Sequence, residues 1–284
     1  MRKKIAVIND LSGFGRCSLT AAISVISAMG VQPCPLPTAV LSAQTGYPSY
    51  YWDDYTDKME YFRREWEKMG ASFDGIYTGF VGSERQIEHI FQFLSTFHRK
   101  DTFLLVDPVM GDDGKVYAMF TDRLCGMMKE LTYQADVVTP NLTELCLLTD
   151  TDYQSIKNLT NGNQLLSAVE KMAKDLIGER SAKVVVTGIS FLDEQDGVQK
   201  IGNLAVTRGQ ARLSAFPAVG GSYSGTGDLF ASVIAGGIAR GDEIEDSIQL
   251  AGSFIEHAMI DSVNEKIPRN EGVNYEQFLG MLIK

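Results

Sequence analysis

The stretch KIAVINDLSGFGRCSLTAAISVISAMG, residues 4–30, decides the fold class because it joins a strand to a helix through a Gly/Ser turn. KIAVIN (4–9) is a short apolar run typical of a buried strand. SLTAAISVISAMG (18–30) has apolar residues at helical spacing and ends on Gly30, a residue favoured just after a helix. A strand followed at once by a helix is the building unit of an α/β protein.

The alternation of strand and helix continues along the rest of the chain. Further strands are expected at 74–80, 103–107, 135–139 and 182–188, with an apolar segment at 36–42 and a hairpin over 198–216 that turns at Arg208-Gly209. Helices are expected at 53–70, 83–98, 142–148, 163–178, 225–241 and 243–260. This pattern requires a mostly parallel sheet covered on both faces. Because no linker, low-complexity tract or repeat interrupts it, we expect a single domain over residues 1–284.

The composition is that of a globular protein with an acidic balance. Of the 284 residues, 44% are hydrophobic and 22% are charged, and the formal net charge is −10. Such a charge argues against nucleic acid or an anionic membrane as the main partner. No segment approaches the ~20 apolar residues of a membrane span, and no secretory signal is recognisable. The four cysteines are scattered, so we expect reduced thiols in a cytoplasmic protein and no zinc site.

Polar turns follow several of the expected strands, and they are the places to look for ligands. They read DLSGFG (10–15), DPVMGDDG (107–114), TPNLTE (139–144) and TG (187–188). In sheets of this kind, ligands bind outside the carboxyl ends of the strands. Neither a G-x-x-x-x-G-K-[ST] loop nor a G-x-G-x-x-G after the first strand occurs, which disfavours a Walker-type ATPase and a Rossmann dehydrogenase.

A glycine-rich turn lies instead near the C-terminus, in GSYSGTGDLF (221–230). Gly225, Thr226 and Gly227 open an expected helix, where backbone N–H groups and the helix dipole favour an anion. Asp228 follows directly, and two interpretations of it stay open. It is either an acid stabilised by the helix dipole, by ~0.3–1 kcal/mol, or a base beside a phosphoryl group, where phosphoryl transfer needs a proton acceptor.

GTGDLFAS resembles the catalytic signature of the ribokinase superfamily, and of its pyridoxal kinase branch in particular. Similar stretches occur in the same order at PTAVLSAQTGY (37–47), TGFVGS (78–83), DPVMGD (107–112), TPNLTELCLL (139–148) and VVVTG (184–188). The resemblance spans nearly the whole chain. It implies a three-layer α/β/α ribokinase-like fold and an ATP- and Mg²⁺-dependent kinase for the 5′-hydroxymethyl group of pyridoxal, pyridoxamine or pyridoxine.

Carried onto this chain, the resemblance implies a reaction centre. Asp228 would deprotonate the substrate hydroxyl, and the N–H groups of Gly225, Thr226 and Gly227 would hold the γ-phosphate. Thr45 would approach the vitamin ring. Together with Asp228, the expected substrate-binding residues are Asp10, Gln44, Thr45 and Phe80.

The resemblance also implies a nucleotide site. Its phosphate- and magnesium-handling residues would be Asp107, Asp112, Asn141 and Glu144, with Asp112 and Glu144 contacting the metal, directly or through water. The ATP groove would be lined by Thr139, Thr187, Gly188, Val219, Gly220 and Gly221. Without the resemblance, Glu144 is an ordinary acid of a first helical turn, and 112–114 is an ordinary turn.

The chain departs from the pyridoxal kinase pattern at three positions. Asp10 stands where a serine is common, Phe80 where a tyrosine is common, and Gln44 where a histidine is frequent. Asp10 and Gln44 resemble hydroxymethylpyrimidine kinases, which typically carry cysteine in place of Asp228. Asp10 either pairs with a cationic group of the vitamer or caps a turn.

These departures keep two alternatives open. The first is a hydroxymethylpyrimidine kinase of the thiamine pathway, or an enzyme that serves both pathways. The second is a non-catalytic vitamer-binding protein. The resemblance further implies a cytoplasmic homodimer, and it leaves open a monovalent cation as an additional cofactor.

Overall fold

The computed structural model describes residues 2–159 and 161–284. The chain folds as two compact units. Unit 1 is formed by two separate segments, residues 1–105 and 219–284, and unit 2 is the intervening segment 106–218. The single domain expected from the sequence stays a prediction.

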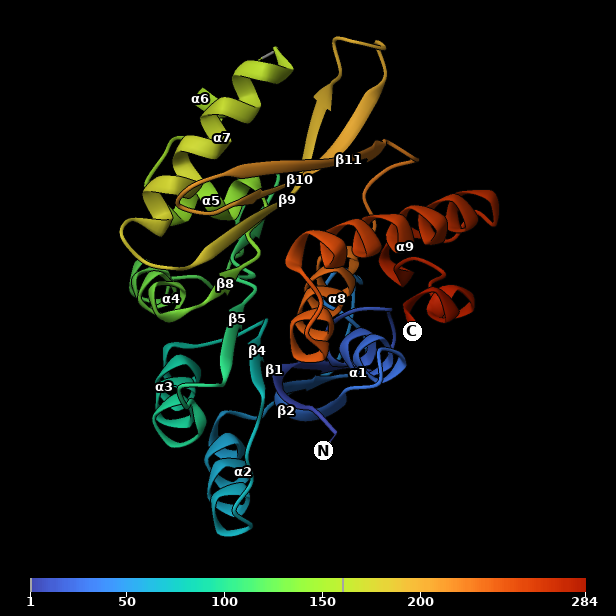
Figure 1. Cartoon of the computed structure of the whole chain (residues 1–284). Coiled ribbons are helices and arrows are strands. Elements are labelled where there is room, and N and C mark those ends of the chain that lie inside the picture. Colours follow the sequence, from blue (N-terminus) through green and yellow to red (C-terminus); the bar gives the residue numbers. More distant parts are fainter. Residues whose placement is uncertain (1, 160) are drawn as a thin grey trace. The chain divides into compact units, whose positions relative to one another are not determined.

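Unit 1 consists of strands that alternate with helices, followed by C-terminal helical turns (Figure 1). Its strands are β1 (Lys4–Ser12), β2 (Gln32–Leu41), β3 (Trp52–Asp54), β4 (Gly75–Thr78) and β5 (Phe103–Val106), whose last residue opens unit 2. Its helices are α1 (Ser18–Ala28), α2 (Thr56–Lys68), α3 (Glu84–Phe97), α8 (Thr226–Arg240) and α9 (Ile244–Asn264), with 3-10 turns η1 (Arg269–Glu271) and η2 (Glu276–Leu282).

Strand β1 lies at the centre of unit 1. The strand order is β5-β4-β1-β2-β3, and β1 pairs in parallel with both β2 and β4. Residues 5–8 of β1 are completely buried because α1 and α8 cover one face of these strands and α2 and α3 cover the other (Figure 1). A central strand covered on both sides needs apolar side chains on both faces, which accounts for the unbroken run IAVI. The carboxyl end of this strand carries the first polar cluster described below.

Unit 2 has its own strands and helices. Its strands are β6 (Gly111–Asp112), β7 (Lys115–Val116), β8 (Val137–Val138), β9 (Lys183–Leu192), β10 (Gln199–Val206) and β11 (Ala211–Pro217). Its helices are α4 (Asp122–Gln134), α5 (Leu142–Leu148), α6 (Tyr153–Lys157) and α7 (Gly162–Ile177). The strand order is β8-β9-β10-β11, with β8 parallel to β9 and the next two pairs antiparallel.

The expected hairpin and most expected helices are confirmed, and the first strand is longer than expected. Strands β10 and β11 pair in antiparallel register from Val206↔Ala211 onward, so the chain turns over 207–210 as predicted. Strand β1 continues to Ser12, which places Asp10 inside the strand and not in the turn that follows it. Helix α4 and the short β6–β7 hairpin were not expected from the sequence.

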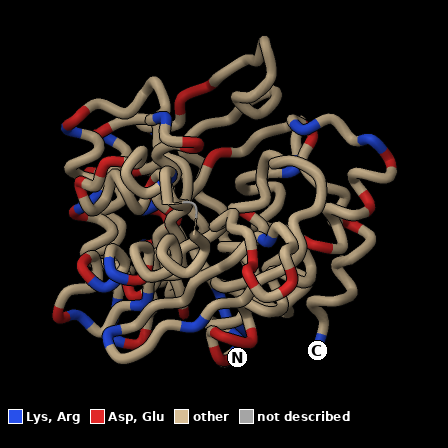
Figure 2. The backbone as a smooth tube through the Cα atoms, turned by 90° about the horizontal axis from the view of Figure 1, so that it is seen from above, with Lys and Arg blue, Asp and Glu red and all other residues tan. Residues whose placement is uncertain are grey.

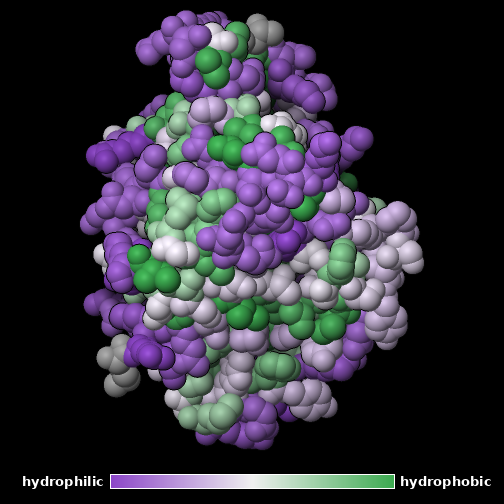
Figure 3. Space-filling view, turned by 90° about the vertical axis from the view of Figure 1, so that its right-hand side faces the viewer, coloured by the Kyte–Doolittle hydropathy of each residue, from purple (hydrophilic) through white to green (hydrophobic). Residues whose placement is uncertain are grey.

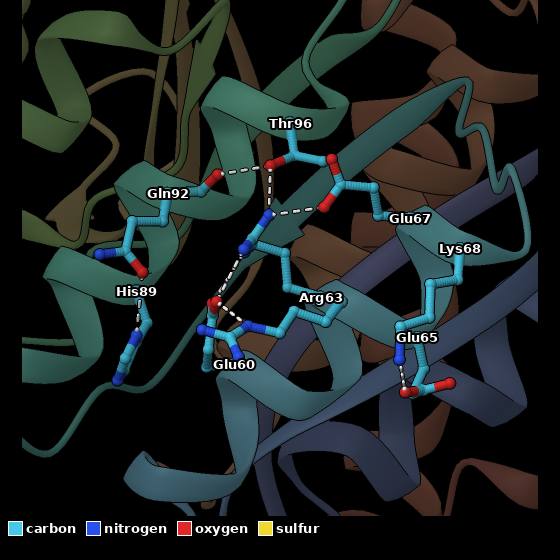
Figure 4. A network of polar contacts seen from close by, with 9 residues as sticks. Glu60, Arg63, Glu65, Glu67, Lys68, His89, Gln92 and Thr96 are labelled. Atoms are coloured by element: carbon cyan, nitrogen blue, oxygen red, sulfur yellow. Dashed lines mark hydrogen bonds and ion pairs between the residues drawn. The ribbon is translucent and has the colours of Figure 1, made fainter.

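A network of charged side chains joins α2 to α3 on the surface of unit 1 (Figure 4). Arg63 donates to both carboxylate oxygens of Glu60, at 2.6 and 2.7 Å, to Glu67 at 3.0 Å and to the Thr96 hydroxyl at 2.9 Å. Hydrogen bonds from Arg63 lower the pKa of Glu60 to about 2. The fork geometry of an arginine satisfies several acceptors at once, so one side chain ties the two helices together.

The surface is polar and acidic. Acidic and basic residues are interspersed along the backbone in Figure 2, consistent with 36 Asp and Glu against 26 Lys and Arg. The face drawn in Figure 3 carries scattered hydrophobic residues among hydrophilic ones, as is usual for globular proteins. Within the described part of the chain, no helix combines the length and apolar character that crossing a bilayer requires.

Candidate active site

The carboxyl end of β1 and the first turn of α8 bring an asparagine and an aspartate together. The Nδ2 atom of Asn9 lies 3.1 Å from Oδ1 of Asp228, although the two residues are 219 positions apart in the sequence. Asn9 is completely buried, whereas Asp228 is partly exposed. Asn9 was not among the expected site residues.

Two backbone N–H groups fix the other side of the Asn9 amide. Its Oδ1 accepts hydrogen bonds from the N–H of Asp10 at 2.9 Å and from the N–H of Phe80 at 2.8 Å. Phe80 follows β4, so the asparagine connects the ends of two neighbouring strands to α8. The only sequence signal for this role is a polar residue at the end of an otherwise apolar run, and that signal is weak.

The carboxyl group of Asp228 has an unusually high pKa. Burial raises the pKa of Asp228 to about 6, and the negative charge of Asp10 adds to the shift. Hydrogen bonds from the Ser18 N–H and the Asn9 amide oppose it. A carboxyl group with such a pKa is ionised at neutral pH and still accepts protons readily, which suits a general base.

The N-terminus of α8 presents backbone N–H groups beside this carboxylate. The helix begins at Thr226, and its N-cap residue, Gly225, has no side chain that could accept from the first N–H groups. Gly225 has φ = 83°, and a Cβ atom there would lie 2.0 Å from the carbonyl oxygen of Arg16. Only glycine therefore fits this position. The uncapped N–H groups and the helix dipole can bind an anion.

Asp10 is a second buried acid in the same cluster. It is 6% exposed, and its Oδ2 accepts from the Ser12 hydroxyl at 2.8 Å. Burial raises its pKa, and a hydrogen bond from the Ser18 hydroxyl opposes part of the shift. Ser18 has φ = 51°, in the left-handed region, and it contacts both acids, Asp10 through its hydroxyl and Asp228 through its N–H.

The other expected substrate-binding residues lie around this cluster in different environments. Gln44 is buried, and its amide donates to the Asn270 carbonyl at 3.0 Å and accepts from the Gly46 N–H at 2.7 Å. These contacts tie its loop to η1. Phe80 is partly exposed and stacks edge-on against Trp52, with ring centroids 5.7 Å apart. Thr45 is exposed.

Unit 2 carries a second polar cluster at the start of α5. Asn141 and Glu144 form a reciprocal cap, in which Oδ1 of Asn141 accepts from the Glu144 N–H at 2.9 Å and Oε2 of Glu144 accepts from the Asn141 N–H at 2.8 Å. Oε1 of Glu144 accepts from the Met110 N–H at 3.1 Å. In the same unit, the Thr139 hydroxyl donates to Asp107 at 2.9 Å. Glu144 therefore lies in the first turn of α5, as the sequence predicts, and its role in a nucleotide site stays a prediction.

The remaining expected nucleotide residues lie in loops and at strand ends. Asn141 pairs with Thr187 in an isolated parallel bridge, and its Nδ2 donates to the carbonyl of Gly111, beside the exposed Asp112. Gly188 has φ = 67°, and its N–H donates to Asn203 at 3.2 Å. The residues expected from 219 to 221 lie in the loop of unit 1 that precedes α8.

A comparison with known families identifies the chain. The sequence profile described as phosphomethylpyrimidine kinase matches residues 14–272, which is most of the chain. The chain belongs to the phosphomethylpyrimidine kinase family.

Among the proteins similar to this chain are two with crystal structures and one compared by sequence alone. A crystal structure named as a phosphomethylpyrimidine kinase of Bacteroides thetaiotaomicron, in a form with pyridoxal, is 37% identical over 99% of this chain and 96% of its own, with a TM-score of 0.90. The pyridoxal kinase of Lactobacillus plantarum is 28% identical over 99% and 96% of the two chains, with a TM-score of 0.83. The pyridoxine/pyridoxal/pyridoxamine kinase of Bordetella avium is 27% identical over 87% of this chain and 81% of its own length.

These comparisons confirm two of the expectations. The chain belongs to the pyridoxal kinase branch of the ribokinase-like superfamily, and its fold is the expected α/β arrangement of a mostly parallel central sheet with helices on both sides. The roles assigned to individual residues from the resemblance stay predictions.

Kinases of this family are expected to use Mg²⁺, and the acidic residues of unit 2 offer carboxylate oxygens, the type of ligand that this ion prefers. Both carboxylate oxygens of Glu144 already accept backbone N–H groups, and among the described residues no group of three or more His, Cys, Asp or Glu could hold a metal directly. Burial and the charges of Asp107 and Asp112 raise the pKa of Glu144 well above its ordinary value. A cation close to these carboxyl groups would favour their ionised form, and Mg²⁺ usually keeps several waters when it binds.

Proposed function

We propose that this chain transfers the γ-phosphoryl group of ATP to the 5′-hydroxymethyl group of pyridoxal, pyridoxamine or pyridoxine. The family and the named relatives support an alcohol-directed kinase of the pyridoxal branch. The observation that carries the proposal is the Asp228 carboxylate, with its pKa near 6, beside the uncapped N-terminus of α8. A proton acceptor and an anion-binding turn are the two parts that phosphoryl transfer needs in one place.

The proposed chemistry assigns a separate task to each part of the α8 turn. Asp228 accepts the proton of the substrate hydroxyl as its oxygen attacks phosphorus. The N–H groups of Gly225, Thr226 and Gly227 donate to the oxygens of the transferred group and stabilise the charge that spreads over them. The bond from phosphorus to the β,γ-bridging oxygen breaks, and ADP leaves with that oxygen.

The proposed nucleotide site uses the unit 2 cluster. Asp107, Asp112, Asn141 and Glu144 would act on the ATP phosphates, and Asp112 and Glu144 would hold Mg²⁺ through its waters. When bound, the ion would neutralise phosphate charge. Residues that would line the nucleotide are Thr139, Thr187, Gly188, Val219, Gly220 and Gly221. Removal of Mg²⁺ with a chelator should abolish turnover, and its readdition should restore it.

A second candidate substrate is hydroxymethylpyrimidine. The family name and the presence of Asp10 favour this substrate. Asp10 lies on β1, its side chain is 6% exposed, and its carboxylate accepts hydrogen bonds from serine hydroxyls. The two roles expected for Asp10, pairing with a cationic group of the vitamer and capping a turn, both stay predictions. Whether it selects the substrate is tested by kcat/KM for the three B6 vitamers and hydroxymethylpyrimidine in wild type and Asp10→Ser. Unchanged ratios among the four substrates would remove Asp10 from substrate selection.

The decisive experiment measures ADP formation with each of these four compounds. Wild type should turn over at least one B6 vitamer, and Asp228→Asn should lower kcat by about 100-fold or more, with little change in nucleotide affinity. The matched control is Ser232→Ala, one turn further along α8, because the Ser232 hydroxyl is buried and has no hydrogen-bond partner among the described residues. ADP formation with none of the four compounds, despite vitamer binding, would favour the non-catalytic alternative.

Assembly and location are proposed from the resemblance alone. We expect a homodimer, which light scattering coupled to size-exclusion chromatography would show as twice the 31.2 kDa chain mass. We also expect a cytoplasmic enzyme, and fractionation of cells of the source organism would test this. Turnover measured in Na⁺ and in K⁺ would decide whether a monovalent cation is an additional cofactor.

A further inference from the structure

We propose that Asn9 is a positioning residue that orients the Asp228 carboxylate through its amide N–H, with the amide itself locked by two backbone N–H groups. This inference deepens the proposed function and rests on it. It concerns a residue that the family signature at residues 225–228 does not include.

The hydrogen-bond pattern determines which end of the amide faces Asp228. The N–H groups of Asp10 and Phe80 approach the same side-chain atom of Asn9, at 2.9 and 2.8 Å. Both can only donate, so that atom must be the oxygen. The NH₂ group therefore points to Oδ1 of Asp228, 3.1 Å away. Because Asn9 is completely buried, its amide has no water toward which it could turn instead.

The backbone around Asn9 is shaped to accept this amide. A Cβ atom at position 79 would lie 2.4 Å from Nδ2 of Asn9, so glycine is needed there. Residue 79 directly follows β4, which pairs in parallel with β1 through Ile8↔Thr78. Strand β1 therefore carries the Asn9 side chain, and the glycine after β4 leaves the space that this side chain occupies.

The charges around Asp228 explain why a neutral donor suits this position. Two titratable groups face it from neighbouring elements. Asp10 on β1 raises the pKa of Asp228, and the buried Cys17 thiol, which precedes α1, has its own pKa raised by burial and by the charge of Asp228. The negative charge of Asp10 already favours protonated Asp228. A further acid at position 9 would strengthen that effect, and a cation would weaken Asp228 as a base. An amide donates a hydrogen bond without adding charge.

The test uses two substitutions of Asn9. Asn9→Leu keeps the approximate shape and removes the donor, whereas Asn9→Asp keeps an acceptor for the two backbone N–H groups and turns an oxygen toward Asp228. We expect either change to lower kcat by about 10-fold or more at pH 7 with KM for ATP within about twofold. The acidic limb of the kcat/KM profile should move to higher pH by about half a unit or more.

A titration that does not depend on activity separates this proposal from the proposed function. Aspartate labelled with ¹³C at the carboxyl carbon reports the Asp228 pKa directly, and Asp228→Asn assigns its signal. The signal should titrate at higher pH in the Asn9 variants than in wild type. If wild type lacked kinase activity, the proposed function would fail, and the titration would still test the Asn9 contact.

The control is Thr78→Val on the adjacent strand. The Thr78 hydroxyl is buried and has no hydrogen-bond partner among the described residues, so its loss should leave the profile and the titration unchanged. If thermal unfolding shows that the Asn9→Leu variant is folded, its results decide the test. If that variant does not fold, the results of Asn9→Asp decide it. A pH profile and an Asp228 titration that coincide with those of wild type in the deciding variant would overturn the proposal.

Discussion

A single carboxylate illustrates how a reactive group lowers the stability of the protein that carries it. Asp228 has a pKa raised from 3.8 to about 6 by burial and by Asp10. Between these two values the folded protein binds a proton that the unfolded chain has released. Folding is therefore favoured at low pH, and this contribution is lost as the pH rises through about 6.

We expect Asp228→Asn to be more stable than wild type at pH 8 and equal to it below pH 4. The amide cannot ionise, and its oxygen can still accept the hydrogen bond from the Asn9 side chain. The gain should be about 1–2 kcal/mol, less than the full shift implies because the side chain is partly exposed. Urea unfolding at both pH values measures it. A variant that is less stable at pH 8 would contradict the expectation.

Asn9 shows where prediction from the sequence ends at the residue scale. Asp228 was identified because it lies within a local signature at 225–228. The role of Asn9 depends on a contact over 219 positions, and no local pattern encodes it. The substrate role expected for Gln44 stays a prediction, whereas the contacts of its amide to Asn270 and Gly46 are revealed only by the folded loops.

At the scale of elements, the start of α8 depends on one glycine. Gly225→Ala would combine φ = 83° with a Cβ atom 2.0 Å from the Arg16 carbonyl oxygen. We expect it to lower the free energy of unfolding by about 2 kcal/mol or more. The control, Gly227→Ala, adds a Cβ atom that meets nothing within 4 Å and should not destabilise the fold. Urea denaturation of both variants compares them, and equal losses would disprove the steric argument.

The contact between α2 and α3 should respond to pH through Arg63. Arg63→Met removes the donors that hold the pKa of Glu60 at about 2, against an ordinary value of 4.5. A lowered acid pKa stabilises the fold above the unfolded value, and this stabilisation is lost as the pH falls toward 2. We expect a loss of about 1–2 kcal/mol at pH 7 that shrinks toward pH 2.

The control for this prediction is the neighbouring arginine. Arg64 also donates to Glu60, but its side chain is 62% exposed against 18% for Arg63, so Arg64→Met should cost clearly less stability. Guanidinium unfolding curves between pH 2 and 7 test both variants. A loss from Arg63→Met that does not change with pH would show that its ion pair with Glu60 contributes nothing.

At the scale of the whole molecule, the order of strands and helices was predictable, and the lengths of several elements were not. Apolar runs such as 5–8 identify buried strands because both faces of the sheet are covered. Asp10 was placed in a turn because it is polar, yet β1 continues through it, since Ser12 and Ser18 satisfy its carboxylate. Helix α4 mixes charged and polar residues with its apolar ones, which hid its apolar stripe.

We expect the two units to unfold in one transition. Unit 2 is inserted in the sequence between the two segments of unit 1, so its chain is tied to unit 1 at both ends. Calorimetry should therefore give one peak whose calorimetric and van 't Hoff enthalpies agree. Two resolved peaks would show that the units unfold independently and would contradict the single domain expected from the sequence.

The discontinuous path of unit 1 has a consequence for biosynthesis. Residues 1–105 leave the ribosome first, but α8 follows only after all of residues 106–218 have been translated. Until then the amide of Asn9 lacks the carboxylate that it contacts in the finished protein. A nascent chain that stalls before Gly225 has neither the proposed base nor the anion-binding turn. Chains that terminate early should therefore have no kinase activity, and phosphorylation of the substrate would indicate that translation was complete.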